Sequence, residues 1–165
     1  MTDRIFNNRR MALRAAAGTL AVALTALAPF ASAQARPMHA DTHASLPGEQ
    51  QHDGIRYVTG GIGADKAAAF RHEMNAYPLA IELREHQKGS RHDEYTADAR
   101  VRIARPGGKE VFSARSEGPF MLVRLAPGTY EVSATLGDRT LHKRHVVIAR
   151  NRTVHETFVF PAGTA

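Results

Sequence analysis

Histidine is the residue type that first suggests chemistry in this chain, because nine histidines occur among 165 residues. Imidazole is a common ligand of zinc and copper, but a zinc site needs three or four ligands that converge on one ion. Neither an HxH pair nor an HExxH signature occurs in the sequence. We therefore expect no resident cofactor, and the alternative of weak metal capture depends on four candidate ligands, His39, His43, His142 and His155.

The C-terminal histidines could share a site only if the last two expected strands, residues 139–149 and 153–160, paired as a hairpin. Residues on the same face of such a hairpin would meet. His142 and His145, however, have an odd separation and point to opposite faces of one strand unless a bulge intervenes. The spacing favours solvated surface histidines over an assembled metal site.

The sequence shows no complete set of residues for nucleophilic catalysis. The chain has no cysteine, and no serine stands in a GxSxG setting. The paired carboxylates Asp93 and Glu94 fall in an expected loop, where solvation is their simplest role. We expect a protein that is not an enzyme. Carbohydrate binding stays open as an alternative, although the chain has no tryptophan for a stacking platform.

The glycine-rich stretch 60–66, GGIGADK, precedes an expected helix and allows two interpretations. It lacks the Lys-Ser or Lys-Thr pair of a phosphate-binding loop. In the first interpretation the glycines only steer the helix so that Phe70 and Met74 cover the end of a sheet. In the second, the turn and the outer face of the helix form a docking surface for a partner. The residues of that possible surface are Gly60, Gly61, Gly63, Arg71 and Glu73.

The sequence pattern predicts that a mainly β domain positions the candidate residues named above. Residues 64–75 favour one short helix, which Pro78 ends, and apolar residues alternate with polar ones along most of the chain that follows. Turn residues recur every eight to twelve positions or so. The pattern predicts an antiparallel Greek-key β-sandwich of seven or eight strands, with one short helix near its N-terminus.

The stretch 125–132, LAPGTYEV, joins two of these strands. Pro127 and Gly128 suit the second and third positions of a type II turn. Tyr130, at the start of the next strand, can bury its ring and donate its hydroxyl to a nearby backbone carbonyl, as in the tyrosine corner of Greek-key sandwiches. Residues 120–125, FMLVRL, are nearly all apolar, which indicates a central strand covered on both faces.

The segment from Ala97 to Ala149 resembles the carboxypeptidase regulatory-like domain family, whose fold is a transthyretin-like (prealbumin-like) sandwich. The resemblance is carried by ADARVRI, by SEGPFMLVRLAPGTYEVSA, and within that by the pattern Leu-x-Pro-Gly-x-Tyr-x-Val. It implies the fold and no particular activity, because such domains serve as appendages, stalks and binding modules. The helix that follows GGIG has no counterpart in the family pattern.

The first 33 residues have the pattern of a secretory signal. Arginines precede an apolar stretch at residues 15–27, and small residues allow cleavage after Ala33 or Ala35. The pair Arg9–Arg10 leaves the twin-arginine export route open beside the general one. Removal of residues 1–33 lowers the net charge from +6 to +3, and the remaining charges are dispersed. We therefore expect no binding of nucleic acid.

The sequence thus predicts a signal peptide (1–33), a disordered histidine-containing tail (34–53), a β-sandwich (54–161) and a short C-terminal tail (162–165). No segment after the signal is apolar enough to span a membrane, and no cysteine is available for lipid attachment. We expect a periplasmic or secreted, non-enzymatic binding or accessory module of the bacterial envelope, with an unknown envelope protein as partner. A periplasmic zinc- or copper-binding protein and a carbohydrate-binding module are the alternatives.

Overall fold

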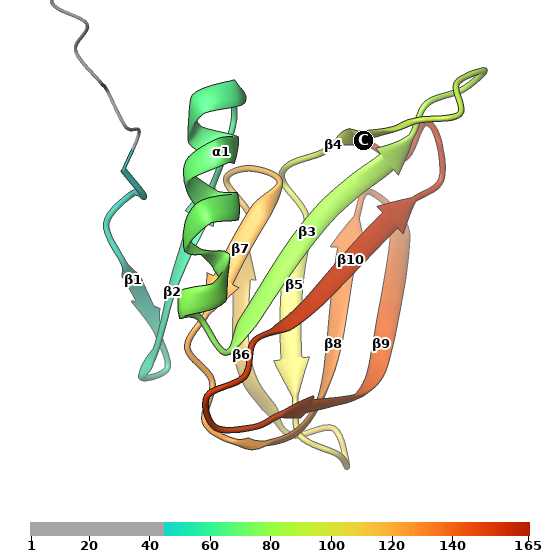
Figure 1. The fold of residues 1–165 in the computed structure, drawn as a ribbon. Coiled ribbons are helices and arrows are strands. Elements are labelled where there is room, and N and C mark those ends of the chain that lie inside the picture. Colours follow the sequence, from blue (N-terminus) through green and yellow to red (C-terminus); the bar gives the residue numbers. More distant parts are fainter. Residues whose placement is uncertain (1–44) are drawn as a thin grey trace, which may run out of the picture. The chain divides into compact units, whose positions relative to one another are not determined.

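Two β-sheets and one short helix make up the part of the chain that the computed structural model describes, residues 45–165 (Figure 1). The expected signal peptide, the first part of the expected tail, and His39 and His43 lie outside the described residues. The helix α1 spans Ala64–Glu73 and continues into a 3₁₀ turn, η1, at Met74–Ala76.

The first sheet has six strands in the order β1-β2-β7-β3-β10, and β4 pairs with the end of β3. The second sheet has four strands in the order β6-β5-β8-β9. The strands of the first sheet are β1 (Gln50–His52), β2 (Ile55–Gly60), β3 (Leu79–His86), β4 (Asp93–Tyr95), β7 (Phe120–Val123) and β10 (Val154–Phe160). Those of the second are β5 (Arg100–Ala104), β6 (Glu110–Arg115), β8 (Gly128–Leu136) and β9 (Arg139–Ile148).

The prediction of a mainly β fold with one short helix is confirmed. The structure adds two details. It has ten strands rather than seven or eight, because the three-residue strands β1 and β4 escape any periodicity test. One strand pair, β3 with β10, is parallel, whereas the other pairs among the described residues are antiparallel.

The main core lies between the two sheets, where the inward residues of each alternating strand meet. Leu83 and Phe158 reach it from the first sheet, and Ile103 and Phe112 reach it from the second; each is at most 1% exposed. Burial of such side chains contributes about 1.5–3 kcal/mol each, which makes this layer the main source of stability.

A second, smaller core lies between α1 and the outer face of the first sheet. Phe70 of the helix stacks on Phe120 of β7, with ring centroids 5.6 Å apart, and Leu122 and Ala80 complete the floor. Met121 and Val123 of the same strand face the main core instead. The strand β7 is therefore buried on both faces, as its unbroken apolar sequence predicted.

The connection from β7 to β8 keeps the tyrosine corner but not the turn. Tyr130 is 2% exposed, and its hydroxyl donates to the carbonyl of Ala126 at 2.9 Å. The expected type II turn is wrong: Gly128 has φ 158° and already begins β8, whereas the third position of that turn needs about +80°. The chain passes from one sheet to the other here, so it bends gradually instead of reversing.

The domain also begins earlier than Gly54. Gln50–His52 pair with Ile55–Tyr57, and the Tyr57 hydroxyl donates to the Gln50 side-chain carbonyl at 2.6 Å. Glu49 forms ion pairs with Arg124 and Arg56. The C-terminal part of the segment that the sequence assigned to a disordered tail is therefore fixed on the first sheet by backbone and polar contacts, which hydrophobicity alone does not reveal.

Candidate functional site

The C-terminal histidines do not share a site, because β9 and β10 belong to different sheets. His142 is exposed on β9, where it pairs with Ser133 of β8. His155 lies on β10, beside β3, and its Nε2 is 3.1 Å from Oδ1 of Asn75. The hypothetical hairpin of the last two strands is therefore wrong, since a parallel partner far away in sequence captures β10.

The strand β9 carries a bulge at Arg144 and His145, which both lie opposite Glu131. His145 has φ 58°, a left-handed conformation that marks the extra residue. Among residues 45–165, no group of three or more histidine, aspartate or glutamate side chains is placed to hold a metal ion. His142 and His155, the two candidate ligands within the described residues, are thus not brought together by any contact among residues 45–165.

The glycine-rich turn is largely an internal feature. Gly60 and Gly61 are buried, and a Cβ atom on Gly61 would stand 2.5 Å from Cδ2 of Phe120. Gly63 is exposed and caps α1 with its backbone, because its carbonyl accepts a hydrogen bond from the N–H of Ala67 at 2.9 Å. Gly60 and Gly61 consequently cannot belong to an exposed docking surface in this structure, and they allow Phe70 and Phe120 to stack.

Of the other residues of the possible docking surface, Gly63 and Arg71 are exposed and Glu73 is half-buried. Arg71 reaches from the helix across the face of the sheet, and its Nη1 donates to the hydroxyl of Tyr95 at 3.2 Å. Glu73 instead turns towards His72, with Oε1 2.9 Å from Nδ1. Arg71 therefore belongs with a group of residues on β3 and β4, whereas Glu73 lies outside that group.

Tyr95 is the centre of this group and is 42% exposed. The guanidinium of Arg84 lies 5.2 Å from the centre of its ring, and Arg84 is also bonded to Glu82. Beneath it, the ring of Phe120 lies at a centroid distance of 5.3 Å. We call Arg71, Glu82, Arg84 and Tyr95 the tyrosine platform.

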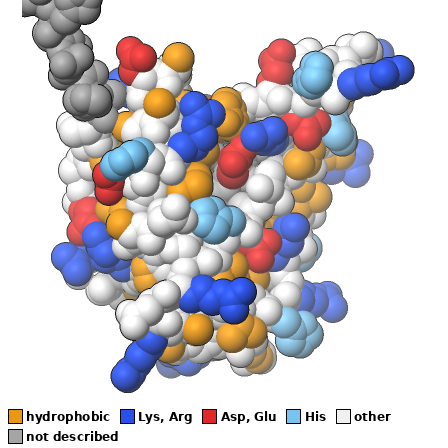
Figure 2. Space-filling model, viewed as in Figure 1, with side chains coloured by type: hydrophobic (Ala, Val, Ile, Leu, Met, Phe, Trp, Pro, Cys, Tyr) orange, Lys and Arg blue, Asp and Glu red, His pale blue; other side chains and the backbone are white. Residues whose placement is uncertain are grey.

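The tyrosine platform lies on the outer face of the first sheet, beside α1. Among the described residues, the helix packs over β2, β7 and Ala80 at the start of β3, and its apolar contacts include neither the later outer residues of β3 nor any residue of β10. Figure 2 shows this face hollowed between α1 and the β3–β4 connection, with charged side chains along the hollow. The Glu82 carboxylate bonded to Arg84 raises the pKa of that guanidinium, which keeps its charge fixed beside the ring.

From the sequence, Tyr95 is one of four candidate aromatic residues for a binding platform, with Tyr57, Tyr77 and Phe112, and nothing distinguishes it from the others. It lies in a three-residue strand that the pattern assigned to a loop, and only its pairing with Arg84 across β3 and β4 brings it to the platform. Cross-strand neighbours of this kind are set by register, which one sequence does not provide.

The chain matches no family model, and no curated protein is significantly similar to it. Within the described residues, no helix has both the length and the apolar character needed to cross a bilayer. The fold and the platform therefore define this protein only as a two-sheet β domain with a helix on one outer face and an ordered polar surface next to that helix.

Proposed function

We propose that this chain is a non-enzymatic, exported binding module of the bacterial envelope, and that the tyrosine platform contacts a partner protein. The single observation behind the proposal is the geometry of Tyr95, an exposed aromatic ring that is fixed by Arg71, Arg84 and Phe120. Aromatic residues and arginines dominate the binding energy of protein interfaces.

The ordering of the platform supports a binding role. A partner that contacts a mobile tyrosine or arginine must offset the conformational entropy that is lost, about 0.5–1.5 kcal/mol for each immobilised side chain. Here the ring and both guanidiniums are already positioned by contacts within the chain. Among residues 45–165, the apolar contacts of α1 stop at Ala80 of β3 and include no residue of β10, so a partner segment can lie on the outer face of these strands beside α1.

Export and family membership belong to the same proposal. The arginines, the apolar stretch and the small residues before Ala33 support a cleaved signal and a periplasmic or secreted location. The Leu-x-Pro-Gly-x-Tyr-x-Val pattern supports kinship with the carboxypeptidase regulatory-like domains. The buried Tyr130 and its bond to Ala126 are consistent with that kinship, because the same tyrosine stands in the pattern.

The partner can be sought with a photo-crosslinking amino acid at Thr157, in cells that express the chain naturally. Thr157 is exposed on β10 and pairs in register with Glu82 of the platform. We expect a defined adduct at this position that disappears when Tyr95→Ala or Arg71→Ala is added. The same probe at Val147, which is 58% exposed on β9 of the other sheet, should not give this adduct.

Two results would contradict the proposal. One is an adduct at Thr157 that persists unchanged in both variants, since the platform would then contribute nothing to binding. The other is no adduct at Thr157 while the probe at Val147 captures a partner, which would place the interface on the second sheet. Circular dichroism of the two variants checks that the fold is retained.

A further inference from the structure

A cavity of about 460 Å³ lies at one end of the sandwich, away from the tyrosine platform. Three connections form it: the η1–β3 junction, the β7–β8 connection and the β9–β10 connection, which brings the chain from the second sheet back to the first. Its volume falls in the range of sites for small ligands, about 300–1,000 Å³. In Figure 1 this is the lower end of the domain, where the chain passes from β9 into β10.

The walls of the cavity carry an excess of positive charge. Arg124, Arg150 and Arg152 line it, and no aspartate or glutamate is among the lining residues. Arg150 and Arg152 flank Asn151, which has φ 57° and turns the chain between them. Within residues 45–165, neither of these two arginines has a carboxylate within ion-pair distance.

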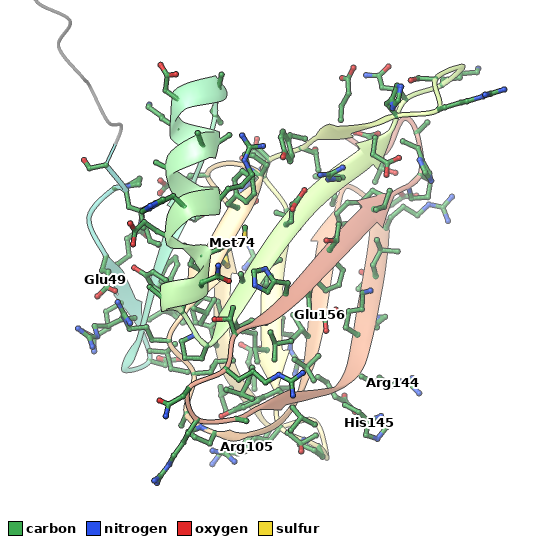
Figure 3. All side chains as sticks on the ribbon, viewed as in Figure 1. Glu49, Met74, Arg105, Arg144, His145 and Glu156 are labelled. Carbon is green, nitrogen blue, oxygen red and sulfur yellow. The ribbon has the colours of Figure 1, made fainter. Side chains whose placement is uncertain are left out.

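Arg124 is held rigidly at the opposite wall. Its guanidinium lies 4.2 Å from the ring centre of Tyr77, and its Nε donates to Oε1 of Glu49 at 2.6 Å. The same Oε1 accepts a bond from the Tyr77 hydroxyl at 3.1 Å. Figure 3 shows Glu49 beside β1, and Glu49 is not among the residues that line the cavity. The contact shows that this end of the domain already binds one carboxylate through arginine and tyrosine donors.

The β9–β10 connection is also fixed, so its arginines are carried on an ordered support. The hydroxyl of Thr153 donates to the carbonyl of Asn75 at 2.9 Å, and the backbone N–H of Val154 donates to the carbonyl of Pro78 at 2.9 Å. Asn75 itself lines the cavity, and its Oδ1 lies 3.1 Å from Nε2 of His155. With Oδ1 accepting from His155, the amide N–H groups of Asn75 are left as further donors.

From this arrangement we propose that the cavity binds a small oxyanion ligand, one that carries carboxylate or phosphate groups, between Arg150, Arg152 and Arg124. Guanidinium groups bind planar carboxylates and phosphate oxygens through paired, charge-assisted hydrogen bonds. The ligand occupies the side of the cavity that Glu49 leaves open. This site is separate from the tyrosine platform, so the two proposals stand or fall independently.

Isothermal titration calorimetry and ¹⁵N NMR with citrate and with inorganic phosphate as probes test the proposal. The measurements use the exported full domain in about 0.1 M NaCl, where exposed charges are screened beyond about 10 Å. We expect saturable binding of at least one probe at a single site, with shifts of the Asn75 and Asn151 side-chain amides. The double variant Arg150→Gln/Arg152→Gln should weaken that binding about tenfold or more, because it removes two charge-assisted donors from the site.

The matched control is Arg91→Gln/Arg100→Gln, which removes the same charge at the opposite end of the domain. Arg100 pairs with Thr135 at the far end of β8, and Arg91 lies in the β3–β4 connection. This control should leave the affinity nearly unchanged. An equal loss in both double variants, or no saturable binding of either probe, would overturn the proposal. Tighter binding of citrate than of phosphate would assign the ligand to carboxylates, and the reverse order to phosphates.

Discussion

Replacement of Gly61 by alanine probes the most constrained point of the fold, the turn between β2 and α1. Gly61 has φ 94°, a conformation that costs a residue with a side chain about 1–3 kcal/mol. The new methyl group would also stand 2.5 Å from Cδ2 of Phe120. Phe120 is fully buried and stacks on Phe70, so its ring has no free space to move into. Overpacking of this kind adds about 1–3 kcal/mol.

The neighbouring substitution Gly63→Ala separates the two costs. Gly63 has φ 92°, almost the same value, but a Cβ atom there meets nothing within 4 Å. It therefore suffers the backbone cost alone. We expect Gly63→Ala to lower the free energy of unfolding by about 1–3 kcal/mol, and Gly61→Ala to lower it by about 2–6 kcal/mol in total.

Urea denaturation followed by far-ultraviolet circular dichroism measures both values, since the chain has no tryptophan to serve as a fluorescent probe. The slope of the transition should be the same in both variants, which shows that the same surface is exposed on unfolding. If Gly61→Ala proves no more destabilising than Gly63→Ala, the close contact with Phe120 does not determine the position of the helix. The packing explanation of the glycines would then be refuted.

Three further predictions concern the core and its tyrosines. Tyr130→Phe removes the bond to the Ala126 carbonyl and should cost about 0.5–1.5 kcal/mol, whereas Leu122→Ala leaves a cavity under α1 and should cost about 2–5 kcal/mol in the same urea assay. Burial, and then the charge of Glu117, raises the pKa of Tyr57 above its ordinary value of 10.0. The folded state therefore holds the phenolic proton more tightly, so the free energy of unfolding should fall as the pH rises above about 10. The variant Tyr57→Phe should reduce that fall. An unchanged pH profile of stability in the variant would contradict this assignment.

Local features of the sequence were sufficient for several elements of the fold. The alanine-rich stretch before Pro78 predicted α1, and the spacing of Phe70 and Met74 predicted the face that it buries. Tyr130 was placed correctly because its role depends on a carbonyl only four residues away. In each case the residues that determine the structure lie close together in the sequence.

The errors arose where distant residues decide the structure. Nothing within residues 153–160 indicates that β3, rather than the adjacent β9, is the partner of β10. The polar residues of β1 have a weak intrinsic preference for a strand. They form one because they pair with the edge of β2 and because the Tyr57 hydroxyl donates to Gln50. The tyrosine platform was only partly foreseen for the same reason: Arg71 was identified on its helix, but Tyr95 reaches it through strand register.

The parallel pairing of β3 with β10 also determines the order in which the domain can assemble. The second sheet contains two hairpins, β5–β6 and β8–β9, whose contacts are local and can form early. The first sheet joins residues 79–85 to residues 154–160, so this edge of the sheet cannot close until residues 154–160 are present. Such long loops slow folding, and the unpaired edge of β3 is meanwhile a template for wrong pairing. The interval before residues 154–160 pair with β3 is therefore when this chain is most open to aggregation.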